Sequence, residues 1–476
     1  MSNHVYRFRS THALLDGFNE LEAQEIYFSP PEHLNDPLEG FKDIFWRGDH
    51  IVWHNLLRHY LLTVMNLSVS WAVMQQEFAL EIPAALLHLT PDDIPDPSIR
   101  AMYEHVAECF FAHRVPNLLV DTLSSEARVV RRDELAYYLR QLQPLLMQIL
   151  TSSFADQGLI SQANSSDSLR VAAEKTASVL ESVLRANRPE TDVDQLFAAL
   201  ENTQSQMTLM QELSNPANGH NDRAWRFIAR DIPGHYVNAL ERILYPDWSV
   251  ACFVTDPTNS SMWGGYGDNH RGVCLKFSTQ TTASGGQALT LRRRVGFSGN
   301  KNGIVETYDY VPHPFEQIRY TADFPEIDFF ESIGALPKFK VEGFWFRSES
   351  GETSSTGSRL RSEDEAWRLD YWNRFLDSFR VKSPEWSHEQ ERRLTLYSML
   401  QPFDEPQSRK LKYKFSDLAG IVFGIKTSVE DKLRIIETVR RKCGAEGRNT
   451  FEIQQAYYSH RSKRIELAPL KLLKFE

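Results

Sequence analysis

The sequence predicts an α+β fold in which a mixed sheet core is interrupted by a large all-helical insertion. Short apolar runs rich in β-branched and aromatic residues occur near both ends of the chain. Between them, apolar residues recur at three- and four-residue spacing, the pattern of amphipathic helices. We therefore expect a discontinuous α/β domain over residues 1–48 and 247–476 and a helical insertion domain over residues 49–246.

The N-terminal piece combines strands with one helix. VYRFRS predicts a strand, and THALLDGFNELEAQ predicts a helix that begins at a Ser10 or Thr11 cap. EIYFS predicts a second strand, and the proline-rich PPEHLNDPLEG that follows predicts a loop.

The middle block is helical throughout its pattern. Stretches such as RRDELAYYLRQLQPLLMQILTSSF and SLRVAAEKTASVLESVLRAN place apolar residues along one helix face. Helices joined by short loops usually pack on one another, so we expect a helical bundle. One role for such a bundle is to bind a protein partner.

Strands return after residue 247. WSVACFVTD and RGVCLKFS are short apolar runs that flank a glycine-rich connector, and RSESGETSSTGSRLRSEDE predicts an exposed, mobile loop. LAGIVFGI predicts a late strand, and SVEDKLRIIETVRRKCG predicts a helix capped by Ser428.

Composition sets limits on function. A formal charge of −10 does not favour extended wrapping of nucleic acid. The four cysteines form no CxxC pair, which disfavours a zinc site and a disulfide framework. The N-terminus lacks the apolar stretch of a signal peptide, and no apolar run is long enough to span a bilayer, so we expect a cytoplasmic protein without membrane contact.

Two carboxylates stand out late in the chain. Glu389 and Glu391 are two residues apart in a run that reads as a strand, so both would project from one face. Like charges that close are unfavourable unless something binds beside them. The alternative is a solvated strand on which the acids pair with Arg392 and Arg393.

Basic and polar residues near the N-terminus form a second candidate set. Alternation on the first strand puts Arg7 and Arg9 on one face, where two guanidinium groups can hold a phosphate or carboxylate, or simply face solvent. Ser29 ends the next predicted strand, and the turn-forming Asn35 and Asp36 follow it. Binding loops often lie at such strand ends, although a plain turn also explains the pattern.

SSMWGGYGDNHRG is the third candidate segment. Trp263, Tyr266 and His270 recur at helical spacing, and the intervening glycines allow close approach of the backbone to a ligand. Two aromatic rings beside a histidine can form a stacking wall for a planar ring. The alternative is that the rings are core residues and the histidine is an ordinary hydrogen-bonded one.

Together these segments resemble a bacterial family catalogued as domain of unknown function 2971. The resemblance rests on four motifs in order: Tyr6 to Ser10, Tyr27 to Glu39, Met262 to Gly272, and Trp386 to Arg393. The closing LAGIVFGIKTSVEDKLRII is also similar to that family. The resemblance does not extend to the helical block.

The motif order is similar, more distantly, to that of the ADP-ribosyltransferase superfamily, especially DarT-like toxins. This resemblance implies an ADP-ribosyltransferase-like sheet and NAD as substrate, with no metal. Glu391 would be the catalytic carboxylate and Glu389 its helper on the acceptor side. Arg7 or Arg9 would bind the pyrophosphate, Trp263 and Tyr266 would flank nicotinamide, and His270 would lie near a ribose.

The resemblance implies an effector or toxin, with anti-phage defence as one role, that modifies a macromolecule or hydrolyses NAD. The acceptor stays open between protein, RNA, DNA and water. One alternative is a non-catalytic nucleotide-binding module on a helical scaffold. Another is a metal-dependent nuclease, which is disfavoured because arginine rather than lysine follows the acid pair.

Overall fold

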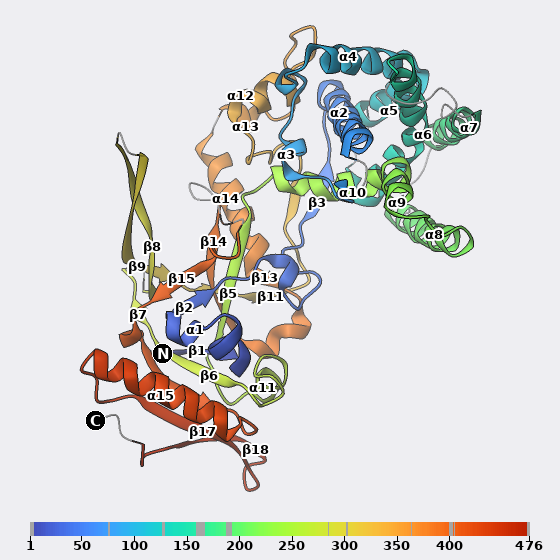
Figure 1. The fold of residues 1–476 in the computed structure, drawn as a ribbon. Coiled ribbons are helices and arrows are strands. Elements are labelled where there is room, and N and C mark those ends of the chain that lie inside the picture. The colour runs from blue at the N-terminus through green and yellow to red at the C-terminus, as the bar shows by residue number, and fades with distance from the viewer. Residues whose placement is uncertain are drawn as a thin grey trace. The chain divides into compact units, whose positions relative to one another are not determined.

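The computed structural model describes residues 4–74, 77–125, 129–158, 167–186, 193–283, 285–300, 303–362, 364–398, 403 and 405–473. The chain divides into two compact units (Figure 1). Unit 1 comprises Met1–Phe41, Asp247–Phe324 and Leu376–Glu476, and unit 2 comprises Lys42–Pro246 and Pro325–Phe375. This division differs from the expected boundaries chiefly because residues 325–375 go with the helical unit. The architecture is α+β.

Unit 1 is built on an eight-stranded mixed sheet, in which β1 lies between β5 and β6 and is antiparallel to both. Across the sheet the order is β10 (Glu316–Gln317), β14 (Glu391–Tyr397), β5 (Trp248–Val254), β1 (His4–Arg9), β6 (Val273–Ser278), β16 (Leu418–Phe423), β17 (Glu452–Ser459) and β18 (Arg464–Pro469). The strand that carries Glu391 is thus separated from the VYRFRS strand by β5 alone. Two strands that lie about 380 residues apart in the sequence therefore belong to one sheet.

Two further sheets complete unit 1. One has the order β2 (Glu25–Tyr27), β15 (Lys410–Tyr413), β8 (Gln287–Asn300) and β7 (Gln280–Thr281), with β9 (Gly303–Pro314) paired to β8; the other joins β11 (Arg319–Tyr320) to β13 (Val381–Lys382) in parallel. The short helical elements are η1 (Ala13–Gly17), α1 (Glu20–Ala23), η2 (Pro31–His33), α11 (Ser260–Gly265), η10 (Pro384–Glu389) and η11 (Phe415–Asp417). The helix expected over residues 11–24 is interrupted because Asn19 takes a left-handed conformation.

The late strand and helix are confirmed as β16 and α15 (Val429–Ala445). The Ser428 side chain accepts a hydrogen bond from the Asp431 backbone N–H at 3.0 Å, the N-cap that the sequence predicts. Apolar residues of α15 pack on one face of the main sheet, together with Val5, Phe253 and Leu394. The other face carries a smaller apolar cluster around Phe8 and Trp263. The two faces therefore have different characters.

Unit 2 is mainly helical. Its helical elements are α2 (His50–Met74), α3 (Ala84–Leu87), η4 (Pro91–Asp93), α4 (Pro97–Ala112), α5 (Arg114–Ser125), α6 (Arg132–Asp156), α7 (Asp167–Arg185), α8 (Val193–Ser214), α9 (His220–Arg226), η7 (Phe227–Asp231), α10 (Ile232–Ala239), η8 (Leu240–Ile243), α12 (Lys338–Lys340), η9 (Val341–Trp345) and α13 (Ser358–Ser362); α14 (Glu365–Arg380) begins in this unit. A three-stranded sheet, β12 (Glu326–Asp328), β3 (Asp43–Trp46) and β4 (Val130–Arg131), joins them. Because β4 falls inside residues 49–246, that block is not purely helical.

Candidate functional site

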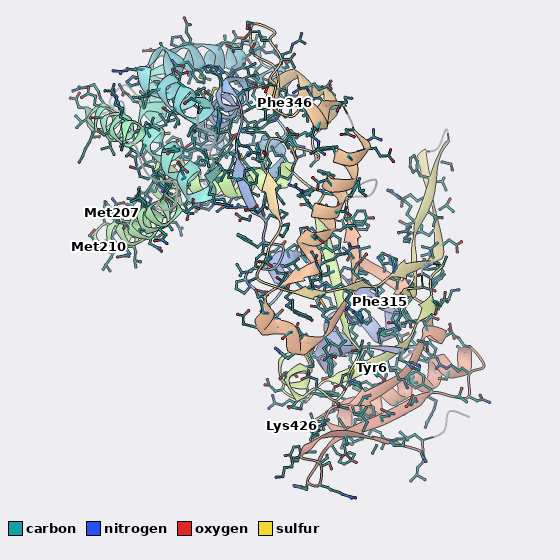
Figure 2. The ribbon with its side chains drawn as sticks, turned by 180° about the vertical axis from the view of Figure 1, so that it is seen from behind. Tyr6, Met207, Met210, Phe315, Phe346 and Lys426 are labelled. Carbon is teal, nitrogen blue, oxygen red and sulfur yellow. The ribbon has the colours of Figure 1, made fainter. Side chains whose placement is uncertain are left out.

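A row of side chains crosses three neighbouring strands of the main sheet. Val254 of β5 pairs with Tyr6 of β1 on one side and with Glu391 of β14 on the other, so all three project from the same face. Figure 2 labels Tyr6 within unit 1. A pocket of about 30 Å³ opens on this face, room for about two water molecules. Its lining consists of Tyr6, Phe8, Cys252, Phe253, Val254, Met262, Tyr266, Glu389 and Glu391.

Glu389 and Glu391 reach this pocket from different elements. The expectation that both lie on one strand is wrong: Glu389 ends η10, and Gln390 turns the chain with φ +48° before β14 begins at Glu391. The two carboxylates nevertheless converge. Lys382 Nζ donates to Glu389 Oε2 at 2.7 Å and to Glu391 Oε2 at 3.4 Å. The lysine thus supplies the positive charge that two neighbouring acids require.

Arg393 is the second buried cation of the cluster. Its side chain is 0% exposed, and its Nε and Nη2 each donate to a Glu391 oxygen at 2.9 Å. Its Nη1 donates to Glu39 Oε1 at 2.5 Å and to the Phe379 carbonyl at 2.9 Å. Such a two-pronged contact fixes Glu391 in orientation. The solvated-strand alternative fails for Arg393, which is buried rather than exposed.

The cluster places three carboxylates, those of Glu39, Glu389 and Glu391, beside the cations of Lys382 and Arg393. With every group ionised, it carries one net negative charge. All five side chains are 3% exposed or less. In so dry a setting each charge depends strongly on its partners.

The pKa values of Glu391 and Glu39 are shifted in opposite directions. Burial alone would raise the pKa of Glu391, but Arg393 and Lys382 outweigh it and lower that pKa to about 2. Burial raises the pKa of Glu39 in spite of the same two cations. Burial lowers the pKa of Lys382, but Glu391 and the other acids more than compensate and raise it. Glu391 and Lys382 are therefore firmly charged at neutral pH.

Tyr266 closes the pocket on the other side of Glu389. Its hydroxyl donates to Glu389 Oε1 at 2.6 Å. Burial and the Glu389 charge both raise the pKa of Tyr266, so the phenol stays protonated and donates. Glu389 thus lies between two donors, a phenol and an ammonium. Lys382 Nζ also lies 5.0 Å from the centre of the Trp386 ring.

Trp263 and His270 do not line the pocket with Tyr266. Trp263 is 0% exposed, donates from Nε1 to the Pro257 carbonyl at 2.8 Å, and packs edge-on against Phe8 at 4.8 Å. It is a core residue, as the alternative reading had it. His270 has φ +68°, and burial lowers its pKa; its Nδ1 is buried and has no hydrogen-bond partner in the described part of the chain.

Arg7 and Arg9 project from the opposite face of the sheet. Arg7 donates to the Tyr27 carbonyl at 2.8 Å and lies over the Phe253 ring at 5.4 Å, while Arg9 pairs with Glu20 at 2.5 Å. The strand alternation was predicted correctly, but the side chains that face the glutamates are Tyr6 and Phe8. The expectation that the arginines share a site with Glu391 is therefore wrong.

The Ser29 to Asp36 segment contributes indirectly. Ser29 forms a backbone bridge with Val250, Asn35 is exposed, and the buried Asp36 accepts a hydrogen bond from the Ser383 backbone N–H at 3.4 Å. Glu39, three residues after Asp36, is the residue from this part of the chain that enters the charge cluster. In the described part of the chain, no group of three or more His, Cys, Asp and Glu side chains is placed to hold a metal ion.

Comparison with known proteins finds one family. The family described as "Protein of unknown function (DUF2971)" matches residues 262–394. This range contains Tyr266, Lys382, Glu389, Glu391 and Arg393, whereas the N-terminal motifs lie outside it. No curated protein and no solved structure matches the chain. Within the described residues, no helix has both the length and the apolar character needed to cross a membrane.

Proposed function

We propose that this pocket binds the nicotinamide end of NAD and that the protein breaks the bond between nicotinamide and ribose. What supports the proposal is the position of Glu389, a buried carboxylate at the end of a pocket walled by Tyr6, Phe8 and Tyr266. The nicotinamide ring of NAD is planar and cationic. Aromatic walls and a carboxylate are the groups that attract such a ring.

In the proposed reaction, the bond between the nicotinamide nitrogen and ribose C1′ breaks, and its electron pair neutralises the ring. Positive charge then develops on the ribose, where Glu389 stabilises it. A hydroxyl, an amine or water attacks C1′ and releases a proton. The products are nicotinamide, a proton and ADP-ribose joined to the acceptor, which can be a macromolecule or water.

In this proposal Glu389, rather than Glu391, stabilises the developing charge, and Glu391 takes a supporting role. Both oxygens of Glu391 are held by Arg393, so this carboxylate has little freedom to respond to a substrate. Glu389 receives one phenol and one ammonium donor, and each of its oxygens retains acceptor capacity. Glu391 is then a positioning residue that fixes Lys382 and Arg393.

The pocket must open before a ring can enter, since about 30 Å³ accommodates water but no heterocycle. The Tyr266–Glu389 hydrogen bond is the contact that closes it. Outward movement of Tyr266 would free both Glu389 Oε1 and the space beside it. Tyr266 is accordingly proposed as the gate to the site.

The test is direct: the purified full chain is incubated with NAD, and free nicotinamide is measured by chromatography. Release above the rate without protein is the expected result. Calorimetric binding of NAD without release would favour the second candidate, a non-catalytic nucleotide-binding module. The pairing of both Glu391 oxygens with Arg393 is also consistent with that candidate, because it leaves Glu391 no part in a reaction. Neither binding nor release would contradict both.

An effector or toxin role is a further part of the proposal. A cell that expresses the chain is expected to lose NAD or to carry an ADP-ribosylated macromolecule, and its growth to stop. Expression of a Glu389→Gln variant at the same level should spare growth. Equal toxicity of the wild type and the Glu389→Gln variant would show that the toxicity does not depend on this pocket.

A further inference from the structure

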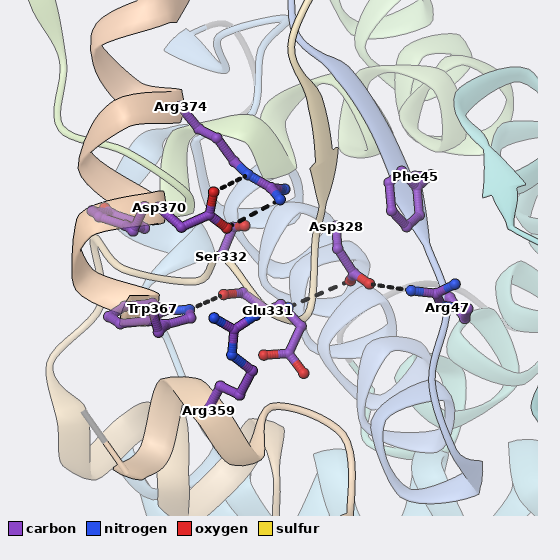
Figure 3. A pocket seen from close by; sticks show the side chains of 10 residues that line it. Phe45, Arg47, Asp328, Glu331, Ser332, Arg359, Trp367, Asp370 and Arg374 are labelled. Atoms are coloured by element: carbon purple, nitrogen blue, oxygen red, sulfur yellow. Dashed lines mark hydrogen bonds and ion pairs between the residues drawn. The ribbon is translucent and has the colours of Figure 1, made fainter. Parts of the chain in front are cut away.

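Unit 2 contains a larger cavity of about 170 Å³, shown in Figure 3. Its lining combines three aromatic rings, three arginines, three carboxylates and one serine: Phe45, Trp367, Tyr371, Arg47, Arg359, Arg374, Asp328, Glu331, Asp370 and Ser332. Pockets for drug-sized ligands run to roughly 300–1,000 Å³, so this one suits one small planar heterocycle of nucleobase size. No residue of this cavity lines the Glu389 pocket.

Four of the six charged side chains are paired with each other. Arg374 donates from Nε to Asp370 at 3.2 Å and lies 3.1 Å from its other oxygen. Arg47 lies 3.6 Å from Asp328, an ion pair rather than a close hydrogen bond. These pairs need no ligand.

Glu331 and Arg359 are the remaining two. Glu331 Oε1 accepts from the Gly357 backbone N–H at 2.9 Å, whereas Oε2 is buried and has no hydrogen-bond partner among the described residues. The Arg359 guanidinium forms no hydrogen bond or ion pair within the described ranges, although the Arg359 carbonyl accepts from the Ser362 hydroxyl at 3.0 Å. Figure 3 shows both side chains at the cavity with no contact drawn between them. A buried carboxylate oxygen without a donor is costly unless a ligand supplies one.

The position of Glu331 is built by an ordered loop. Asp49 Oδ2 accepts from the Ser354 hydroxyl and from the Ser355 backbone N–H, each at 2.7 Å. Gly357 follows with φ +70°, and a Cβ there would lie 2.3 Å from the Phe346 ring, so glycine is required. Phe346 is labelled in Figure 2. The described part of this segment is therefore held in place, contrary to the mobile loop expected from its composition.

One wall of the cavity is a flat aromatic pair. Trp367 stacks on Tyr371 with ring centres 5.2 Å apart, and its Nε1 donates to the Glu331 carbonyl at 2.8 Å. The indole is thus fixed next to the Glu331 backbone. A fixed ring beside a carboxylate and an arginine favours a planar ligand with both donors and acceptors on its edge.

We propose that this cavity binds a guanine base. Guanine presents two adjacent donors, N1–H and the N2 amino group, to the unpaired oxygen of Glu331. It presents the acceptors O6 and N7 to Arg359, the arginine–guanine contact familiar from base recognition. Adenine has an acceptor at N1, which would face the carboxylate unfavourably. The cavity therefore selects guanine over adenine, in a free nucleotide or in a single strand.

The experiment is calorimetric titration of the full chain with GMP, with AMP, and with short single strands that contain one guanine or one adenine. GMP is expected to bind at least about tenfold more tightly than AMP. A guanine strand that binds more tightly than GMP identifies a strand as the source, and equal or weaker binding identifies the free nucleotide. Equal affinity for guanine and adenine ligands, or binding of neither, overturns the proposal.

Two variants locate the binding. Glu331→Gln keeps the acceptor for Gly357 but presents an amide in place of the charge, so the preference for GMP should fall to within about threefold of AMP. Arg359→Ala alters an exposed side chain, so folding is retained, and GMP binding should weaken about tenfold. Glu365→Gln, an exposed acid outside the cavity, is the matched control and should change nothing. Unchanged GMP binding in Arg359→Ala overturns the assignment even if Glu331→Gln fails to fold.

Discussion

The two pockets differ in how their charges are used. In unit 1, Arg393 and Lys382 form ion pairs with three buried carboxylates, and about 30 Å³ of space remains; Glu39 Oε2 accepts no hydrogen bond within the described residues but lies 3.8 Å from Lys382 Nζ. In unit 2, the 170 Å³ cavity keeps one carboxylate oxygen of Glu331 and the Arg359 guanidinium without partners in the described chain. The first arrangement ties its charges to stability, while the second leaves them available to a ligand. Substitutions of Arg393 and Glu391 should therefore affect folding, whereas substitutions of Glu331 and Arg359 should affect binding.

The largest effect is expected at Arg393. Arg393→Met removes the cation that holds Glu39 and Glu391 and leaves the three buried acids of the cluster with Lys382 as their one cation. Breaking a buried pair from one side costs about 3–5 kcal/mol. Urea denaturation followed by circular dichroism should show an early transition for this variant. A loss under about 1 kcal/mol would mean that the cluster is wetter than the structure indicates.

The second-largest effect is expected on the pH dependence of stability, which should differ between the charge cluster of unit 1 and the cavity of unit 2. Because Glu391 has its pKa lowered from 4.5 to about 2, its pairing contributes stability that is complete above pH 5 and is lost as the pH falls toward 2, about 3 kcal/mol in total. The raised pKa of Glu39 opposes part of this loss, since the folded state takes up that proton more readily than the unfolded one. Wild type and Glu391→Gln should lose their difference in urea midpoint over this pH range; a difference that persists at pH 2 would contradict the pairing.

Asp328 in the unit 2 cavity should behave in the opposite sense. Burial is the main cause that raises its pKa to about 6, so stability increases as the pH falls from 6 toward 4. Asp328→Asn should raise stability at pH 7 by about 1 kcal/mol and remove this dependence. Thermal unfolding at pH 7 and pH 5 measures both effects. A less stable variant at pH 7 would show that the pair with Arg47 outweighs the burial cost.

The smallest effect concerns Tyr266. Tyr266→Phe removes one hydrogen bond to Glu389 but keeps the ring, so stability should fall by only about 1 kcal/mol. If Tyr266 is the gate, NAD affinity should rise or stay equal, because the contact that closes the pocket has been weakened. Binding measured by calorimetry tests this. A large loss of affinity would instead make the hydroxyl a ligand-binding group.

The sequence predicted the sheet better than the site. Short apolar runs identified β5 and β6, and alternation along β1 placed Arg7 and Arg9 together on one face. Alternation cannot say which face meets the glutamates, because both faces of this sheet are covered by apolar residues. The strand pairing that decides this is a tertiary property.

The charge cluster was harder to predict for a different reason. A charged residue in a strand pattern is normally read as solvent-facing, so the burial of Arg393 was missed. Lys382 lies on a two-residue strand that carries no periodic signal. Gln390 in a left-handed conformation separates Glu389 from the strand, which begins at Glu391. The sequence shows no sign of this turn, because residues other than glycine rarely adopt that conformation. The Glu389–Glu391 spacing nevertheless predicted that the two carboxylates lie close together, as their shared contact with Lys382 shows.

The account's central claim is that Glu389 acts on the bound substrate while Glu391 supports the fold. The decisive measurement is nicotinamide release and NAD affinity in one preparation of Glu389→Gln, with the exposed Glu385→Gln on the same 3₁₀ helix as control. Release should fall by about two to four orders of magnitude while NAD affinity stays within about threefold. The control should match wild type. Unchanged release in a folded Glu389→Gln protein would contradict the claim.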